Sequence, residues 1–225
     1  MARPSSRNPS PPPATAGKFF WNESKVTPQL RAGRNRHVGR VLWFTGLPGS
    51  GKSTIATELE RRLFQAGKSV FLLDGDNLRQ GLCADLGFST ADRSENIRRA
   101  AEVAKLFADS GVICLAAFIS PLRADREQTR RIMPAGRYAE IFVNAPLEVC
   151  KQRDPKGLYA RAARGELPEF TGVSAPYEPP ADSEINLHTD RESVETCVTR
   201  ILDFLAKAEA GVESRGEPAL LPLLH

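Results

Sequence analysis

Residues 46–53, GLPGSGKS, constrain this chain more than any other segment, because they fit the pattern G-x-x-x-x-G-K-S in full. An apolar run precedes them at 41–45, and residues 52–66 follow with Ile55, Leu59 and Leu63 at helical spacing. Glycines let successive backbone N–H groups turn inward onto an anion, and the start of a helix adds partial positive charge there. The segment therefore predicts a strand–loop–helix unit that binds nucleotide phosphates.

ATP is the nucleotide we expect in this loop. Lys52 can reach the β- and γ-phosphates, and the Ser53 hydroxyl can ligate Mg²⁺. Pro48 has no N–H, so one potential phosphate donor is absent. The predicted ATP-binding residues are Gly46, Leu47, Pro48, Gly49, Ser50, Gly51, Lys52, Ser53 and Thr54.

Apolar runs and helical periods alternate along the rest of the chain, which favours an α/β fold of the P-loop NTPase type. We expect a five-stranded parallel sheet with helices on both faces and a mobile lid. Further strands are predicted at 69–73, 112–118, 139–143 and 184–188, and further helices from Ser89 or Thr90 to Gly111, at 122–133, at 146–152 with Pro146 in the first turn, and from a cap at Asp190.

The chain divides into four parts by composition. We expect a disordered proline-rich tail at 1–17, an N-terminal arm at 18–40, one catalytic domain at 41–208 and a C-terminal tail at 209–225. Residues 153–180 hold five prolines and three glycines and are interpreted as the long mobile loop that forms the lid.

Charge and cysteine content exclude several classes of protein. Residues 1–40 hold eight of the 31 lysines and arginines but one of the 27 acids, so the net charge of +4 belongs to the arm. The body is thus no general nucleic-acid binder. The four cysteines lack the spacing of a zinc or redox motif and are expected to be buried free thiols. A long apolar span is absent, so no membrane segment is expected.

Two carboxylates, Asp74 and Asp76, follow the second predicted strand. The carboxyl ends of parallel strands meet at one edge of the sheet, so these acids should lie beside the phosphate-binding loop. There they can hold Mg²⁺ or orient an attacking hydroxyl; the alternative is a turn with a helix cap. An N-K-x-D guanine motif is absent, and the strand at 112–118 ends without an acid. This combination favours a small-molecule kinase.

Several ordered motifs resemble those of the adenylylsulfate kinase (APS kinase) family. They cover about residues 20 to 208: WNES at 21–24, LDGDNLR at 73–79, DLGFS at 85–89, DRSENIRR at 92–99, AAFISP at 116–121, RDPKGLY at 153–159, FTG at 170–172 and PYE at 176–178. The resemblance implies transfer of the ATP γ-phosphoryl to the 3′-hydroxyl of adenosine 5′-phosphosulfate (APS) in sulfate assimilation. It also implies Mg²⁺, a cytoplasmic homodimer and an association with a separate ATP sulfurylase, without nucleic-acid or membrane partners.

The same resemblance assigns site residues position by position. It implies Lys52, Asp74, Asp76 and Ser120 as catalytic residues, with Ser120 a serine that could be phosphorylated, and Ser53 and Asp74 as metal ligands. The implied substrate-binding residues are Asp76, Arg79, Phe88, Arg93, Asn96, Ile119, Ser120, Pro121, Lys156, Leu158 and Phe170.

These assignments suit an anionic substrate that carries adenine. Arg79, Arg93 and Lys156 supply positive charge, and Phe88 and Phe170 can sandwich a purine ring. Alternatives exist for each. Phe88 can belong to the core, Lys156 to an ordinary turn, and the arginines of 93–99 to a solvated helix face.

Two other functions fit the same motifs. The chain could be another P-loop small-molecule kinase, or a non-catalytic nucleotide-binding subunit of a sulfurylase complex. The intact Lys52, Ser53, Asp74 and Asp76 argue against the second.

Overall fold

The computed structural model describes residues 24–213. The strands are β1 (Arg40–Thr45), β2 (Val70–Asp74), β3 (Ile113–Ala117), β4 (Tyr138–Asn144) and β5 (Ile185–His188). The helices are α1 (Pro28–Asn35), α2 (Lys52–Gln65), α3 (Gly75–Leu78), α4 (Thr90–Asp109), α5 (Arg123–Ile132), α6 (Leu147–Arg153), α7 (Leu158–Ala163) and α8 (Val194–Glu213). The expected tail at 1–17, the first residues of the arm and the last residues of the chain lie outside this range.

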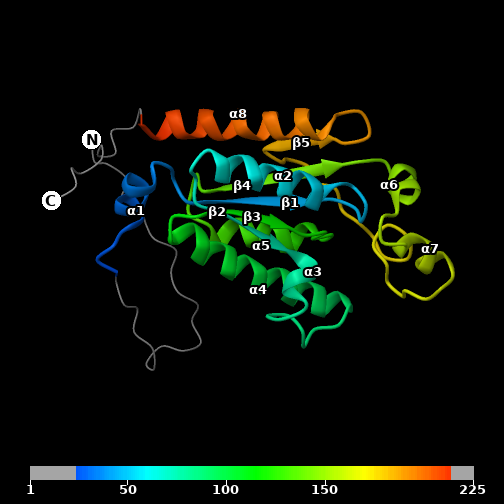
Figure 1. Ribbon diagram of the computed structural model, residues 1–225. Coiled ribbons are helices and arrows are strands. Elements are labelled where there is room, and N and C mark those ends of the chain that lie inside the picture. The colour runs from blue at the N-terminus through cyan, green and yellow to red at the C-terminus, as the bar shows by residue number, and fades with distance from the viewer. Residues whose placement is uncertain (1–23, 214–225) are drawn as a thin grey trace, which may run out of the picture.

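The strands form one parallel sheet in the order β2-β3-β1-β4-β5, which confirms the predicted fold (Figure 1). β1 lies at the centre and all its residues are buried. Because side chains alternate across a strand, Leu42 and Phe44 pack with α2 and α8, whereas Val41 and Trp43 pack with α4. Figure 1 shows α2 and α8 on one face of the sheet and α4 and α5 on the other.

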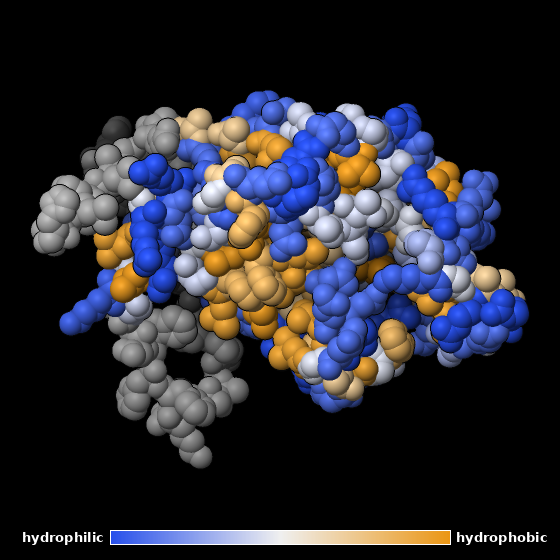
Figure 2. All heavy atoms as spheres, viewed as in Figure 1, coloured by the Kyte–Doolittle hydropathy of each residue, from blue (hydrophilic) through white to orange (hydrophobic). Residues whose placement is uncertain are grey.

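β2 is an edge strand, and part of its apolar surface stays open to solvent. Phe71 is exposed and its ring stacks on Phe107 with the centroids 4.9 Å apart. Figure 2 shows apolar side chains gathered near the middle of the face seen there.

Local structure differs from the sequence prediction at two helix ends, and at a third it selects one of the two predicted caps. α8 begins at Val194 and not near Asp190, because Ser193 Oγ accepts the Thr196 N–H at 3.1 Å and caps it. Pro146 occupies the cap position of α6, one residue before the helix. Ser89 is the residue that caps α4.

The arm and the lid both contain helices that the sequence prediction lacked. α1 lies in the arm and contacts the turn between α4 and β3 through Asn35 Nδ2, which donates to the Gly111 carbonyl at 3.1 Å. α7 lies inside 153–180, so the lid is not loop throughout.

All four cysteines are free and buried, as predicted. Within residues 24–213, no helix is both long and apolar enough to cross a membrane.

Candidate active site

The loop at 46–53 joins β1 to α2, as the motif predicted. Gly51 caps α2 with φ +101°, a conformation that other residues adopt with strain. A Cβ on Gly46 would lie 2.4 Å from the Val143 carbonyl oxygen, so β4 leaves room only for glycine there. Ser50 is buried, whereas Ser53 and Thr54 are exposed in the first turn of α2. The phosphate-binding loop thus ends at the N-terminus of α2.

Lys52 folds back over this loop. Its Nζ donates to the carbonyls of Gly46 at 2.9 Å and Leu47 at 2.8 Å. Burial disfavours the ammonium and lowers the pKa of Lys52 to about 8. A cation held on two carbonyls of the phosphate-binding loop is placed to meet phosphate oxygens.

The predicted metal ligands, Ser53 and Asp74, are in contact. Ser53 Oγ donates to Asp74 Oδ2 at 2.8 Å, and the other Asp74 oxygen accepts the Asp76 N–H at 2.9 Å. Asp74 therefore caps α3, as the alternative interpretation held, and also faces the loop. A hydroxyl and a carboxylate beside phosphates fit Mg²⁺, which takes few protein ligands.

Lys156 reaches this cluster from the lid and forms an ion pair with Asp76. Asp76 and Lys156 lie 80 positions apart in the sequence, and both side chains are exposed. Lys156 is therefore more than a turn residue, because it connects the lid to the end of β2.

Phe88 and Arg79 form one wall of the site. Phe88 is 63% exposed, so it is not a core residue. The Arg79 guanidinium carbon lies 4.4 Å from the centre of its ring, and Arg79 Nη1 also donates to the Gly87 carbonyl at 2.8 Å. The pair presents an open aromatic face backed by positive charge.

Arg93 connects this wall to the lid. Its Nε donates to the Phe88 carbonyl at 2.8 Å, one Nη donates to Thr171 Oγ1 at 2.6 Å and the other to the Glu169 carbonyl. Burial lowers the pKa of Arg93 from its ordinary value. Arg93 thus joins the segments that carry Phe88 and Phe170, and it is not a solvated surface residue.

Phe170 and Leu158 are half-buried in the lid. The Phe170 ring packs edge-on against Tyr159 with the centroids 5.1 Å apart. Asn96, on α4, is buried, and its Oδ1 has no hydrogen-bond partner among the described residues. A buried acceptor without a donor is unusual and marks Asn96 as a candidate ligand-binding residue.

Ser120 does not suit the catalytic assignment. The side chain is buried, and its Oγ accepts the Trp43 Nε1–H at 3.1 Å. The hydroxyl faces the core, so no phosphoryl group reaches it in this conformation. The backbone of the turn at 119–121 is fixed instead: Thr45 donates to the Ile119 carbonyl at 2.8 Å, and the buried Pro121 accepts the Glu178 N–H at 2.9 Å.

Several residues that support the loop were missed by the sequence prediction. Tyr159 Oη donates to the Pro48 carbonyl at 2.9 Å, and Thr189 Oγ1 donates to the Ser50 carbonyl at 2.7 Å. Arg153 Nη2 donates to the Thr189 carbonyl at 2.5 Å. Tyr159 and Arg153 belong to the RDPKGLY motif, but only its lysine and leucine were assigned.

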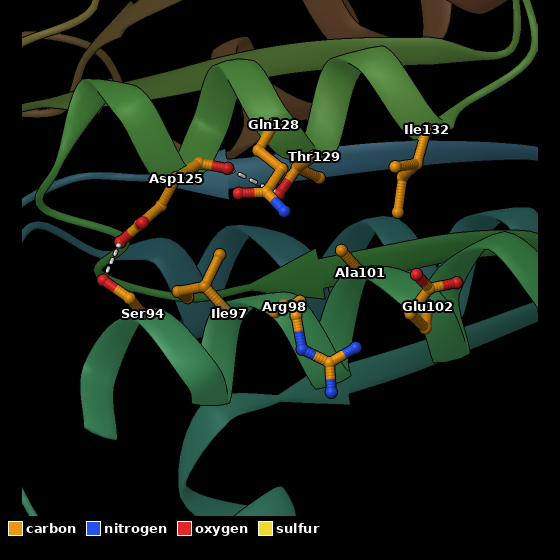
Figure 3. Close-up of a pocket in the computed structure, with 9 residues that line it drawn as sticks. All are labelled: Ser94, Ile97, Arg98, Ala101, Glu102, Asp125, Gln128, Thr129 and Ile132. Atoms are coloured by element: carbon orange, nitrogen blue, oxygen red, sulfur yellow. Dashed lines mark hydrogen bonds between the residues drawn. The ribbon is translucent and has the colours of Figure 1, made fainter. Parts of the chain in front are cut away.

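A small hollow between α4 and α5 is distinct from this site (Figure 3). Its volume is about 20 Å³, which accommodates about one water molecule. Ser94 Oγ donates to Asp125 across it at 3.0 Å, and burial raises the pKa of Asp125. The hollow is too small for a substrate.

A parallel sheet with a phosphate-binding loop after its central strand and carboxylates at the end of the edge strand β2, two places away, defines a P-loop kinase fold. The family model for adenylylsulphate kinase matches residues 38–188. The chain belongs to the adenylylsulphate kinase family.

Individual relatives agree with this assignment. An adenylyl-sulfate kinase of Acaryochloris marina is 54% identical over 190 residues, which are 84% of this chain and 93% of that protein. The structure of the Mycobacterium tuberculosis APS kinase CysC in complex with AMPPNP and APS has 44% identity and a TM-score of 0.72 over 76% of this chain and 99% of that one. A gluconokinase from Sinorhizobium meliloti, at 17% identity and a TM-score of 0.54 over 80% and 99%, shares the fold alone.

Proposed function

We propose that the chain is an ATP-dependent adenylylsulfate kinase. The oxygen of the APS 3′-hydroxyl forms a bond to the γ-phosphorus of ATP, and the bond from that phosphorus to the ADP oxygen breaks. The products are 3′-phosphoadenosine 5′-phosphosulfate and ADP. The observation that carries the proposal is the connection Ser53–Asp74–Asp76–Lys156, which leads from the phosphate-binding loop to the lid.

Each group has a role that follows from its position. Lys52 and the loop N–H groups bind the phosphates and balance their charge. Asp76 accepts the proton of the 3′-hydroxyl. Ser53 and Asp74 would hold Mg²⁺, which would supply further charge neutralisation at the phosphates.

The acceptor is recognised by the wall of Arg79, Phe88, Arg93 and Asn96 together with Lys156, Leu158 and Phe170 of the lid. Phe88 offers a stacking face for adenine, and the cations suit a sulfated phosphate. The tuberculosis relative has been solved in complex with APS and the ATP analogue AMPPNP, which supports this assignment.

Assembly and location stay predictions. We infer a homodimer, and a relative from Thiobacillus denitrificans described as hexameric supports self-association in the family. Sedimentation of the full chain distinguishes a dimer from larger assemblies. An association with ATP sulfurylase and a cytoplasmic location are carried from the family resemblance.

Release of ADP with different acceptors tests the function. We expect turnover with APS and only background with AMP, gluconate or shikimate. Turnover with one of the other acceptors but not with APS indicates a different small-molecule kinase. Binding of ATP without any turnover indicates a non-catalytic nucleotide-binding subunit.

A further inference from the structure

Arg126 of α5 is a buried cation that the proposed reaction does not use. Its side chain is 2% exposed. Nε lies 2.7 Å from Glu140 Oε1, Nη1 donates to the Ser120 carbonyl at 2.7 Å, and Nη2 donates to the Glu178 carbonyl at 2.6 Å. A single planar guanidinium thus holds a carboxylate on β4 and two separate loops.

The two carbonyls belong to two neighbouring segments of the candidate site, which are also joined by the Glu178 N–H donating to the Pro121 carbonyl at 2.9 Å. Ser120 lies in the turn after β3 and has φ +39°, in the left-handed region that a serine adopts with strain. Glu178 lies at the C-terminal base of the lid, and its carboxylate also accepts the Arg123 N–H at 2.7 Å. The strained turn and the base of the lid are therefore held by the same side chain.

Tyr177 connects the base of the lid to the strand that precedes the phosphate-binding loop. Its hydroxyl lies 3.0 Å from Thr45 Oγ1, and Thr45 uses its own proton on the Ile119 carbonyl, so Tyr177 is the donor. Thr45 is the last residue of β1 and directly precedes the phosphate-binding loop. The Tyr177 ring stacks on Phe142 at 6.1 Å and lies 5.9 Å from the Arg126 guanidinium.

We propose that Arg126 and Tyr177 are positioning residues that fix the turn at 119–121 and the base of the lid relative to the phosphate-binding loop. The inference rests on the proposed function. The acceptor nucleotide then binds to a surface that is already ordered. Less of the binding free energy is therefore spent on ordering these loops than if they were free to move. Neither side chain needs to touch substrate.

Three variants test this in the full chain. Arg126→Lys keeps the charge next to Glu140 but cannot reach two carbonyls in a planar fork. Tyr177→Phe removes one hydroxyl and leaves the ring. Arg137→Lys is the matched control: Arg137 forms an ion pair with Asp109 at 3.0 Å and donates to the Gly39 carbonyl at 2.8 Å, at the amino ends of the strands.

The readouts are KM for APS, KM for ATP, kcat and the thermal unfolding midpoint. We expect Arg126→Lys to raise KM for APS about tenfold and Tyr177→Phe about threefold, with KM for ATP changed less than about twofold. Arg137→Lys should lower the midpoint as Arg126→Lys does, but leave KM for APS unchanged. Tyr177→Phe should fold normally and so provides the test if Arg126→Lys does not.

An unchanged KM for APS in Tyr177→Phe, or equal losses in Arg126→Lys and Arg137→Lys, would overturn the proposal. Failure of the proposed function is a separate result, because the wild-type chain would then not turn over APS.

Discussion

The Lys156 ammonium pairs with the Asp76 carboxylate, so the lid contacts α3, the helix that directly follows β2. Tyr159 and Gly172 bring the same lid onto the phosphate-binding loop, at Pro48 and Leu47. The structure therefore has the lid seated over the place where phosphoryl donor and acceptor would meet. Exclusion of water from such a site favours transfer over hydrolysis.

Nucleotide affinity should fall at alkaline pH. Burial lowers the pKa of Lys52 to about 8, so the free protein loses this charge as pH rises through that value. Phosphate oxygens favour the charged form, and ATP binding should therefore weaken by up to about tenfold per pH unit above it. Calorimetric titration of MgATP between about pH 7 and pH 9.5 measures this, with Lys52→Met as the control that should bind weakly at every pH. A flat wild-type profile would contradict the prediction.

Arg93→Ala should impair use of APS far more than binding of ATP. The substitution frees the segments of Phe88 and Phe170 from one another, and we expect KM for APS to rise at least about tenfold. Arg98→Ala is the matched control, because Arg98 lies on the same helix and pairs with Glu95. Steady-state ADP release gives both constants. Equal losses for APS and ATP would count against the role of Arg93.

Asp76→Asn should lower kcat about a hundredfold while the protein still binds ATP, because the amide cannot accept the hydroxyl proton. Lys156→Met breaks the same ion pair without removing the carboxylate. Exposed ion pairs contribute little to stability, so both variants should fold. Asp203→Asn, exposed on α8, controls for loss of a negative charge. If Lys156→Met loses as much kcat as Asp76→Asn, the ion pair and not the base is the important feature.

Gly172→Ala should displace the lid. Gly172 has φ +86°, and an added Cβ would lie 2.9 Å from Leu47 Cδ2. Gly165→Ala is the matched control, because Gly165 has φ +75° and no atom within 4 Å of an added Cβ. Both should lose about 1 kcal/mol from backbone strain, but Gly172→Ala alone should raise KM for ATP, about threefold or more. Thermal unfolding and ADP release separate the two effects. Matching KM values in both variants would show that the contact with Leu47 is unimportant.

The fold was predictable because its signals are local and repeated. Apolar runs of strand length alternate with helical periods, and the 46–53 motif fixes the first strand–helix junction. α7 was missed because its residues, LYARAA, follow a proline–lysine–glycine turn in a segment rich in prolines. The cap of α8 was missed because Asp190 and Ser193 are both good cap residues, and only the packed structure distinguishes them.

The predicted site residues depend on contacts that sequence spacing does not contain. The resemblance gave no hint that Ser120 Oγ bonds Trp43, since the pair lies 77 positions apart. Asn96 and Arg93 were predicted to bind substrate. The sequence did not predict that Asn96 is a buried acceptor without a partner in the part of the chain that the structure describes, or that Arg93 connects two loops. In the sequence, Arg126 is one of several charged residues in a polar helix, and nothing in that pattern predicts burial. In the structure it is among the least exposed arginines of the described chain.

Strand order has a consequence for how such a protein changes its acceptor. β3 lies between β1 and β2, so the ends of β1 and β2 are two strand spacings apart, about 10 Å. Main-chain hydrogen bonding sets this distance, so it does not depend on which side chains lie at the carboxyl ends of the strands. A change of acceptor specificity can therefore be engineered by substitutions in residues 88–96 and 153–180, with the sheet left unchanged.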